Sequence, residues 1–118
     1  MPLASWRYRQ LLSASSYLLR QSMSIQHIVW LKKKESCTDL HMQSLLAEVA
    51  KLTDLIPNIE NISCGRNLTD RANGFTHGII VTLTCQDALA CYINHPAHVS
   101  VGKKLNENAN ILAMDYET

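Results

Sequence analysis

Histidine is the residue type in this chain best suited to acid–base chemistry, and three of its five histidines lie close together in the second half, at His77, His95 and His98. An imidazole has an unperturbed pKa of ~6.5 and can take or give a proton near neutral pH. A fourth, His27, lies in an apolar run that predicts a strand able to bring it to the same place. These histidines are therefore candidates for proton transfer.

Proton removal from carbon needs a base and a donor that holds the resulting enolate oxygen. Pro96 suits the first position of a helix, and a helix N-terminus disfavours an imidazolium at His98. A neutral His98 can then serve as base, with the Tyr92 hydroxyl fixing its tautomer. The alternative is structural: His95 and His98 cap and pin the loop around Pro96, and His27 and His77 are satisfied core histidines.

Histidines also bind Zn²⁺. No His-x-x-x-His pair or acidic ligand accompanies these, so we expect neither metal nor cofactor.

The elements that must position these residues are predicted by hydrophobic periodicity. Residues 25–31 alternate as a strand with two buried faces, in which His27 shares one face with Ile25, Val29 and Leu31. A helix begins near Ser36 or Thr38, carries an apolar stripe, and stops at Pro57.

The rest of the chain predicts a short strand over residues 59–65, a turn at Asn73-Gly74, and a strand over 75–83 with Phe75 and His77 on one face. A helix over 86–92, a helix from Pro96 towards 108 and a strand over 110–116 follow. The order is βαββαβ. It predicts an α+β fold of the ferredoxin-like type, with four antiparallel strands and the helices on one face.

The other face of such a sheet is bare. Ile28, Trp30 and Ile80 are apolar residues expected there, and an exposed apolar sheet face usually marks an interface. We therefore expect a homodimer that packs sheet to sheet.

Four separate segments, in this order, resemble the stress-responsive dimeric α/β-barrel (Dabb) family: His27-Ile28-Val29, Gly74-Phe75-Thr76-His77, Tyr92-x-x-His95-Pro96-Ala97-His98 and Asp115-Tyr116. The resemblance covers about residues 25–117. It implies a ferredoxin-like protomer and a homodimer whose two sheets form a barrel.

What the resemblance implies about function is less uniform. Some members are stress-accumulated proteins with no known chemistry. Another is a plant polyketide cyclase that closes a linear tetraketide acid by an intramolecular aldol reaction. The match to that enzyme implies that His98 is a general base held by Tyr92, and that His27 and His77 line the pocket. A pocket tyrosine of that enzyme falls near Val49, which puts the same substrate in doubt.

Two functional hypotheses follow. The first is a homodimeric stress-response Dabb protein with a small-molecule pocket of unknown ligand, to which His95 and Phe75 also contribute and for which a small hydrophobic or aromatic acid is a candidate. The second is a cofactor-free lyase or cyclase acting on a polyketide-like β-keto acid, with His98 as base. A thermal-shift comparison with His98→Ala distinguishes a binding role from a structural one.

Composition limits the other possibilities. Of the 118 residues 47% are hydrophobic and 18% charged, which fits one globular domain, and no apolar run approaches the ~20 residues that span a bilayer. Residues 23–118 carry eight Lys or Arg and ten Asp or Glu, a net charge of −2 that disfavours nucleic-acid binding. The four cysteines show no Cys-x-x-Cys pairing and are expected to be reduced.

Residues 1–22 contain three arginines and no acid, and three interpretations of this extension stay open. It is a targeting peptide, a loose N-terminal tail, or a segment upstream of a true start at Met23. The domain is expected over residues 23–118. The expected compartment is the cytoplasm, or a mitochondrion or plastid if residues 1–22 are a transit peptide.

Overall fold

The strands and helices of this computed structural model follow the predicted βαββαβ order. Residues 23–118 are described, so the extension predicted for residues 1–22 lies outside the described residues. The elements are β1 (Ile25–Lys33), α3 (Asp39–Ala50), α4 (Leu52–Leu55), β2 (Ile59–Arg66), β3 (His77–Leu83), α5 (Gln86–Asn94), α6 (Pro96–Asn108) and β4 (Ala109–Glu117).

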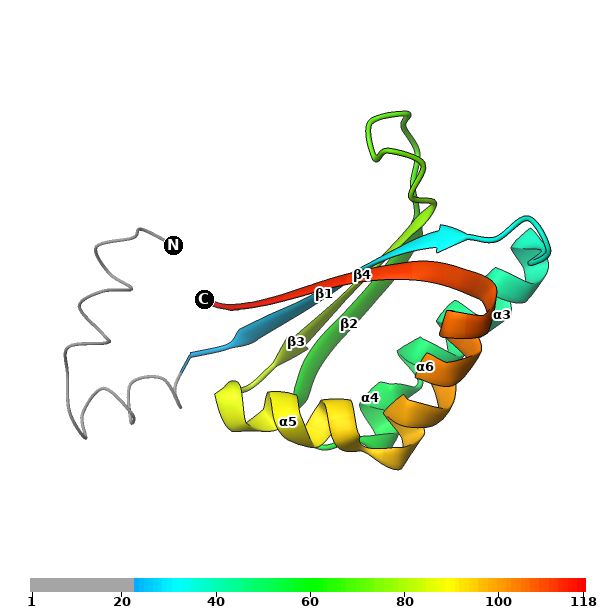
Figure 1. Ribbon diagram of the computed structural model, residues 1–118. Helices are drawn as coiled ribbons and strands as arrows, with labels where there is room; N and C mark the ends of the chain where they lie inside the picture. The colour runs from blue at the N-terminus through cyan, green and yellow to red at the C-terminus, as the bar shows by residue number, and fades with distance from the viewer. Residues whose placement is uncertain (1–22) are drawn as a thin grey trace.

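The four strands form one antiparallel sheet in the order β2-β3-β1-β4. The helices cover one face and leave the other bare (Figure 1). The central strand β1 carries His27, which pairs with Val81 of β3 on one side and with Asp115 of β4 on the other. The ferredoxin-like α+β prediction is confirmed.

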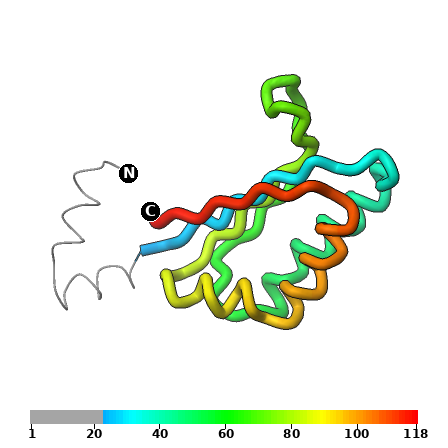
Figure 2. Tube along the Cα trace, viewed as in Figure 1, coloured from blue at the N-terminus to red at the C-terminus, as the bar shows by residue number. Residues whose placement is uncertain are grey.

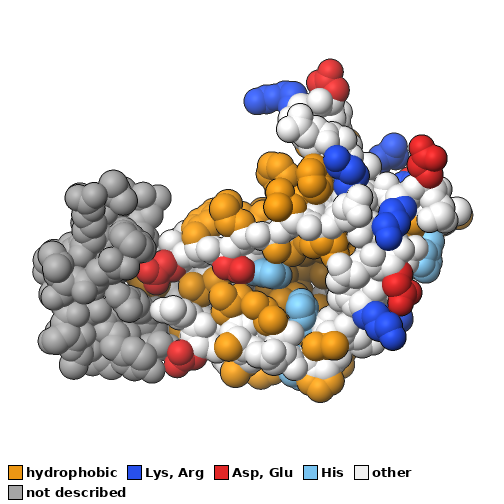
Figure 3. Space-filling view, in the orientation of Figure 1, with side chains coloured by type: hydrophobic (Ala, Val, Ile, Leu, Met, Phe, Trp, Pro, Cys, Tyr) orange, Lys and Arg blue, Asp and Glu red, His pale blue; other side chains and the backbone are white. Residues whose placement is uncertain are grey.

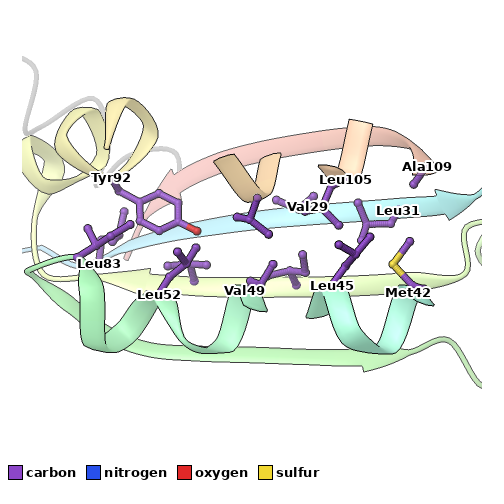
Figure 4. Packing of buried hydrophobic residues seen from close by; sticks show 14 of the residues in the cluster. Val29, Leu31, Met42, Leu45, Val49, Leu52, Leu83, Tyr92, Leu105 and Ala109 are labelled. Atoms are coloured by element: carbon purple, nitrogen blue, oxygen red, sulfur yellow. The ribbon is translucent and has the colours of Figure 1, made fainter. Parts of the chain in front are cut away.

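The core lies between the sheet and the helices. The residues of β1 that share a face with His27 are buried, whereas Trp30 on the opposite face is 47% exposed, so only one of the two faces predicted to be buried is buried within this chain. Leu31, Met42 and Leu45 are at most 1% exposed and pack at one end of this layer, while Tyr92 lies at the other (Figure 4). Burial of each such aliphatic side chain contributes about 1.5–3 kcal/mol, so β1 and α3 are held together mainly by apolar packing.

Local capping explains where the helices begin. Thr38, one of the two predicted starts, is the N-cap of α3, and its hydroxyl accepts the His41 N–H at 3.1 Å. The helix predicted to reach Pro57 is interrupted at Lys51, where α3 gives way to the short α4. Pro96 occupies the first turn of α6, as predicted.

The predicted start of the third strand, at Phe75, is wrong. β3 begins at His77, because a turn with positive φ at Asn73 (52°) and Gly74 (85°) carries the chain into it. The Phe75 N–H bonds to the Ala72 carbonyl, and the Phe75 ring packs edge-on against Trp30 at 5.8 Å between centroids. Phe75 therefore lies with the outer sheet face, not with His77. Figure 2 shows the β2–β3 connection projecting beyond the sheet.

Cys37, Cys64, Cys85 and Cys91 are unpaired in the described residues; Cys37 is buried, Cys64 and Cys85 are half-buried and Cys91 is exposed. Among the helices of residues 23–118, none has both the length and the apolar character needed to cross a membrane.

Candidate functional site

A cavity of about 180 Å³ lies between the helices and the central strands. Most of its lining is apolar and comes from β1, β3, β4, the α3–α4 segment and α6. Its polar lining side chains are His27, Tyr92, His98 and Asn106. Histidine and acidic side chains lie together in the hollow between sheet and helices, surrounded by hydrophobic groups (Figure 3). The site is therefore an apolar pocket with a few polar groups.

His27 enters the cavity from the buried face of β1. Its Nδ1 lies 2.5 Å from Oδ1 of Asp115, the residue directly opposite on β4. The His27 side chain is 8% exposed and that of Asp115 is 33% exposed. A carboxylate only accepts hydrogen bonds, so Nδ1 of His27 is the donor and the ring orientation is fixed.

His98 lies in the first turns of α6, and its Nδ1 is 2.9 Å from the Ile93 carbonyl oxygen. The carbonyl has no proton to give, so Nδ1–H donates and Nε2 of the neutral ring keeps its lone pair. Burial lowers the pKa of His98, the Ile93 hydrogen bond raises it in part, and the nearby His27 lowers it further. His98 is therefore neutral at neutral pH, with Nε2 as its free basic atom.

Tyr92 comes from the buried side of α5 and is 2% exposed. Figure 4 shows its hydroxyl directed towards the space between Val29 and Val49. Burial, with a smaller contribution from Cys64, raises the pKa of Tyr92 to about 12. The hydroxyl stays protonated, and no residue of the described chain hydrogen-bonds to it. It is a donor available to a ligand.

The three rings form one cluster. The centroid of Tyr92 lies 4.6 Å from that of His98 and 5.5 Å from that of His27, and the two histidines are 6.3 Å apart. The sequence predicted that these residues meet, and the structure brings them together. The Ile93 carbonyl, rather than the predicted Tyr92 hydroxyl, fixes the His98 tautomer.

The remaining predicted site residues lie elsewhere. His77 is buried on the inner face of β3, opposite Leu31, and does not line this cavity. The His95 side chain accepts the Ala97 N–H at 3.1 Å and caps α6. This agrees with the alternative prediction that His95 has a structural role at the turn before Pro96. Phe75 lies near Trp30 on the outer face.

The hydrogen-bond acceptors of His27 and His98 were not predicted from the sequence. The C-terminal motif contained Asp115, but its pairing with His27 depends on the register of β4 against β1. The Ile93 carbonyl is a backbone group, so no residue type signals it. In the described part of the chain, no three His, Cys, Asp or Glu side chains are grouped so that they could hold a metal ion. Proton transfer and hydrogen bonding are the chemistry that this arrangement offers.

Fold and site together define a ferredoxin-like α+β protein with a small histidine- and tyrosine-containing cavity. Residues 25–118 match the model of the Stress responsive A/B Barrel Domain, and the chain belongs to this Dabb family.

Several relatives are similar along most of the domain. Olivetolic acid cyclase from Cannabis sativa is 29% identical over 82 residues, which cover 68% of this chain and 81% of that protein. The stress-response A/B barrel domain-containing protein HS1 of Arabidopsis thaliana is 26% identical over 96 residues, 79% of this chain and 88% of that protein. A dimeric ferredoxin-like protein of unknown function from Thermobifida fusca superposes with a TM-score of 0.73 at 21% identity, covering 83% of this chain and 93% of that chain.

Proposed function

We propose that this Dabb protein is a homodimer that binds a small, mainly apolar molecule in the cavity, with the ligand's polar group held by Tyr92 and His98. The observation that carries this proposal is an apolar cavity that contains a free hydroxyl donor and a free imidazole nitrogen. Binding pockets commonly combine apolar walls with a few such polar groups. The preferred ligand is a small hydrophobic or aromatic acid bound in its protonated form, because the carboxyl O–H can then donate to Nε2 of His98 while the carbonyl oxygen accepts from the Tyr92 hydroxyl.

The cavity volume limits the ligand's size. About 180 Å³ is small for a ligand pocket, and in another protein an apolar cavity of about 150 Å³ takes up benzene. One ring with a short polar substituent therefore fits without expansion. Val49 and Leu52 contribute walls to the cavity, so larger ligands require these side chains to move.

A second candidate function is cofactor-free proton transfer, and the hydrogen bond from His98 to Ile93 favours it. In this step Nε2 of His98 takes a proton from a carbon next to a carbonyl group, and the electron pair of the broken C–H bond forms the enolate. The Tyr92 hydroxyl donates a hydrogen bond to the enolate oxygen and keeps its proton. The enolate carbon then attacks a second carbonyl of the same molecule, as in a cyclase, and the resulting alkoxide takes back the proton held on Nε2, which regenerates the neutral imidazole. The similarity to olivetolic acid cyclase supports the reaction type, while Val49 argues against the same substrate.

The outer sheet face supports the homodimer. Its exposed apolar residues are Trp30 (47% exposed), Ile80 (42%), Leu112 (55%), Met114 (60%) and Tyr116 (46%). A continuous apolar face of this kind usually marks an interface, and the similar Thermobifida fusca protein is described as dimeric. Trp30→Glu places a charge in the middle of this face. Light scattering should give twice the chain mass for wild type and the chain mass for the variant; a wild-type monomer at all concentrations would contradict the dimer.

The ligand proposal is tested by thermal shift on the full chain. The panel contains single-ring aromatic acids, β-keto acids and longer-chain analogues, against wild type, His98→Ala and Tyr92→Phe. His41→Ala is the matched control, because His41 is exposed and lies outside the cavity. A ligand at about 100 times its Kd stabilises by about 2.7 kcal/mol.

We expect this stabilisation in wild type and His41→Ala and not in His98→Ala. Turnover of a β-keto acid that His98→Ala abolishes would support the second candidate as well. No shift with any compound, together with a large loss of melting temperature in His98→Ala, would make the histidine structural and refute the proposed function.

A further inference from the structure

A second hollow, of about 430 Å³, lies at the opposite edge of the sheet, between α3 and the edge strand β2. We call it the α3–β2 groove. Asp39 and Gln43 line it from α3, Cys64 and Arg66 from β2, and His77 from β3. It shares no lining residue with the His98 cavity. Its lining is also richer in charged and polar side chains, so it suits a different ligand.

The hydrogen bonds of Thr76 fix the protonation of His77. The Thr76 hydroxyl accepts the Lys33 N–H at 3.0 Å and lies 3.1 Å from the Leu31 carbonyl oxygen. The hydroxyl has a single proton, and it donates this proton to the Leu31 carbonyl oxygen. Nδ1 of His77, at 2.8 Å from the same hydroxyl, must therefore be a donor.

This leaves Nε2 of His77 as an acceptor without a partner. The residue is 9% exposed, and no other hydrogen bond to its ring exists in the described part of the chain. Burial is the main cause that lowers the pKa of His77, and the charges of Arg66 and Lys33 lower it further against an opposing effect of Asp39. The neighbouring Cys64 thiol has its pKa raised by burial. A neutral nitrogen that has no hydrogen-bond partner among the described residues thus lines the groove, where a ligand can reach it.

Arg66 supplies an uncompensated positive charge beside it. Arg66 pairs in register with His77 across β2 and β3. No ion pair to its guanidinium occurs within residues 23–118, whereas the carboxylate of Asp39 is 3.8 Å from Nζ of Lys33. A guanidinium presents a planar set of donors that matches carboxylate and phosphate oxygens.

We propose that the α3–β2 groove is a second binding site, for a small molecule bearing a carboxylate or phosphate group, with one oxygen on Arg66 and another on Nε2 of His77. An anionic oxygen cannot face the Nε2 lone pair unless a proton lies between them. Binding therefore takes up one proton, either onto the imidazole or as a hydroxyl of the ligand. The site acts independently of the His98 cavity.

The test is an NMR titration of the full chain, observing the histidine ring nitrogens, with inorganic phosphate and acetate as separate probes. We expect a saturable change at His77, and a tighter Kd at about pH 6 than at about pH 8 because protonation accompanies binding. Arg66→Gln removes a charged hydrogen bond and should weaken binding by about tenfold or more. Arg71→Gln, an exposed arginine outside the groove, is the control and should bind like wild type.

If only one of the two probes, phosphate or acetate, saturates the change at His77, the site is assigned to that chemical group and the proposal is supported. A linear change that does not saturate, equal Kd values for Arg66→Gln and Arg71→Gln, or a Kd that is the same at both pH values would each overturn it. Wild-type melting temperatures for both variants establish that a lost signal is not caused by unfolding. The result is independent of His98, so it is distinguishable from failure of the proposed cavity function.

Discussion

The pair formed by His27 and Asp115 gives a quantitative prediction. Asp115→Asn keeps the shape of the side chain and removes its charge. The hydrogen bond in question is 2.5 Å long and joins a buried ring to a carboxylate. Hydrogen bonds to charged groups contribute about 1.5–3 kcal/mol, and because the Asp115 side chain is 33% exposed, water screens part of this. We therefore expect a loss of about 1–1.5 kcal/mol in the free energy of unfolding.

The assay is urea unfolding of the full chain at one fixed protein concentration, followed by tryptophan fluorescence. A loss of 1 kcal/mol corresponds to about 4–8 °C in melting temperature for a domain of this size. Asp70→Asn is the control, because Asp70 is exposed and has no interaction within the described residues. It should stay within about 0.5 kcal/mol of wild type.

A double-mutant cycle with His27→Gln isolates the pair. The two single variants and the double variant should show a coupling energy of about 1 kcal/mol, because each single change removes the same hydrogen bond. If Asp115→Asn unfolds at the same urea concentration as Asp70→Asn, the reasoning is refuted: Asp115 then does not hold the His27 ring.

Three further predictions concern stability. Burial lowers the pKa of His98 and of His77 below the unfolded value of ~6.5, so the unfolded chain binds more protons at these two sites. The free energy of unfolding should therefore fall as the pH drops from about 6.5 towards the folded pKa values. The urea midpoint should decrease over this pH range, and it should decrease less steeply in His98→Ala. Thr38→Ala removes the cap on the His41 N–H and should cost about 1 kcal/mol, seen as an earlier urea midpoint. Gly74→Ala forces a side chain into φ +85° and should lower the melting temperature, by an amount corresponding to about 1 kcal/mol.

The parts of the fold that could be predicted are those fixed by local patterns. Alternation placed His27 on the inner face of β1, and Pro96 marked the start of α6. The turn broken by Pro96 made a contact between Tyr92 and His98 compatible with the sequence, and the structure shows that contact. The strand and helix patterns depend on a few neighbouring residues, so they could be predicted, whereas the meeting of the two rings needed the structure.

The parts that failed depend on contacts that no local pattern encodes. The third strand was predicted to start two residues too early, at Phe75, because the turn at Asn73 and Gly74 redirects the chain before β3 begins at His77. His77 was expected in the pocket, but the fully buried Leu31 and Met42 occupy its end of the core. His77 instead lines the groove between α3 and β2, a position that depends on how α3 packs on the sheet.

The measurement that tests the central claim most directly is the protonation state of His98, read from its two ring nitrogens by NMR of the full chain at neutral pH. We predict a neutral ring with the proton on Nδ1, where it bonds to the Ile93 carbonyl, and an unprotonated Nε2 whose signal moves when a cavity ligand is added. A doubly protonated ring, or a neutral ring with its proton on Nε2, would contradict the account, because His98 would then offer the cavity no basic nitrogen.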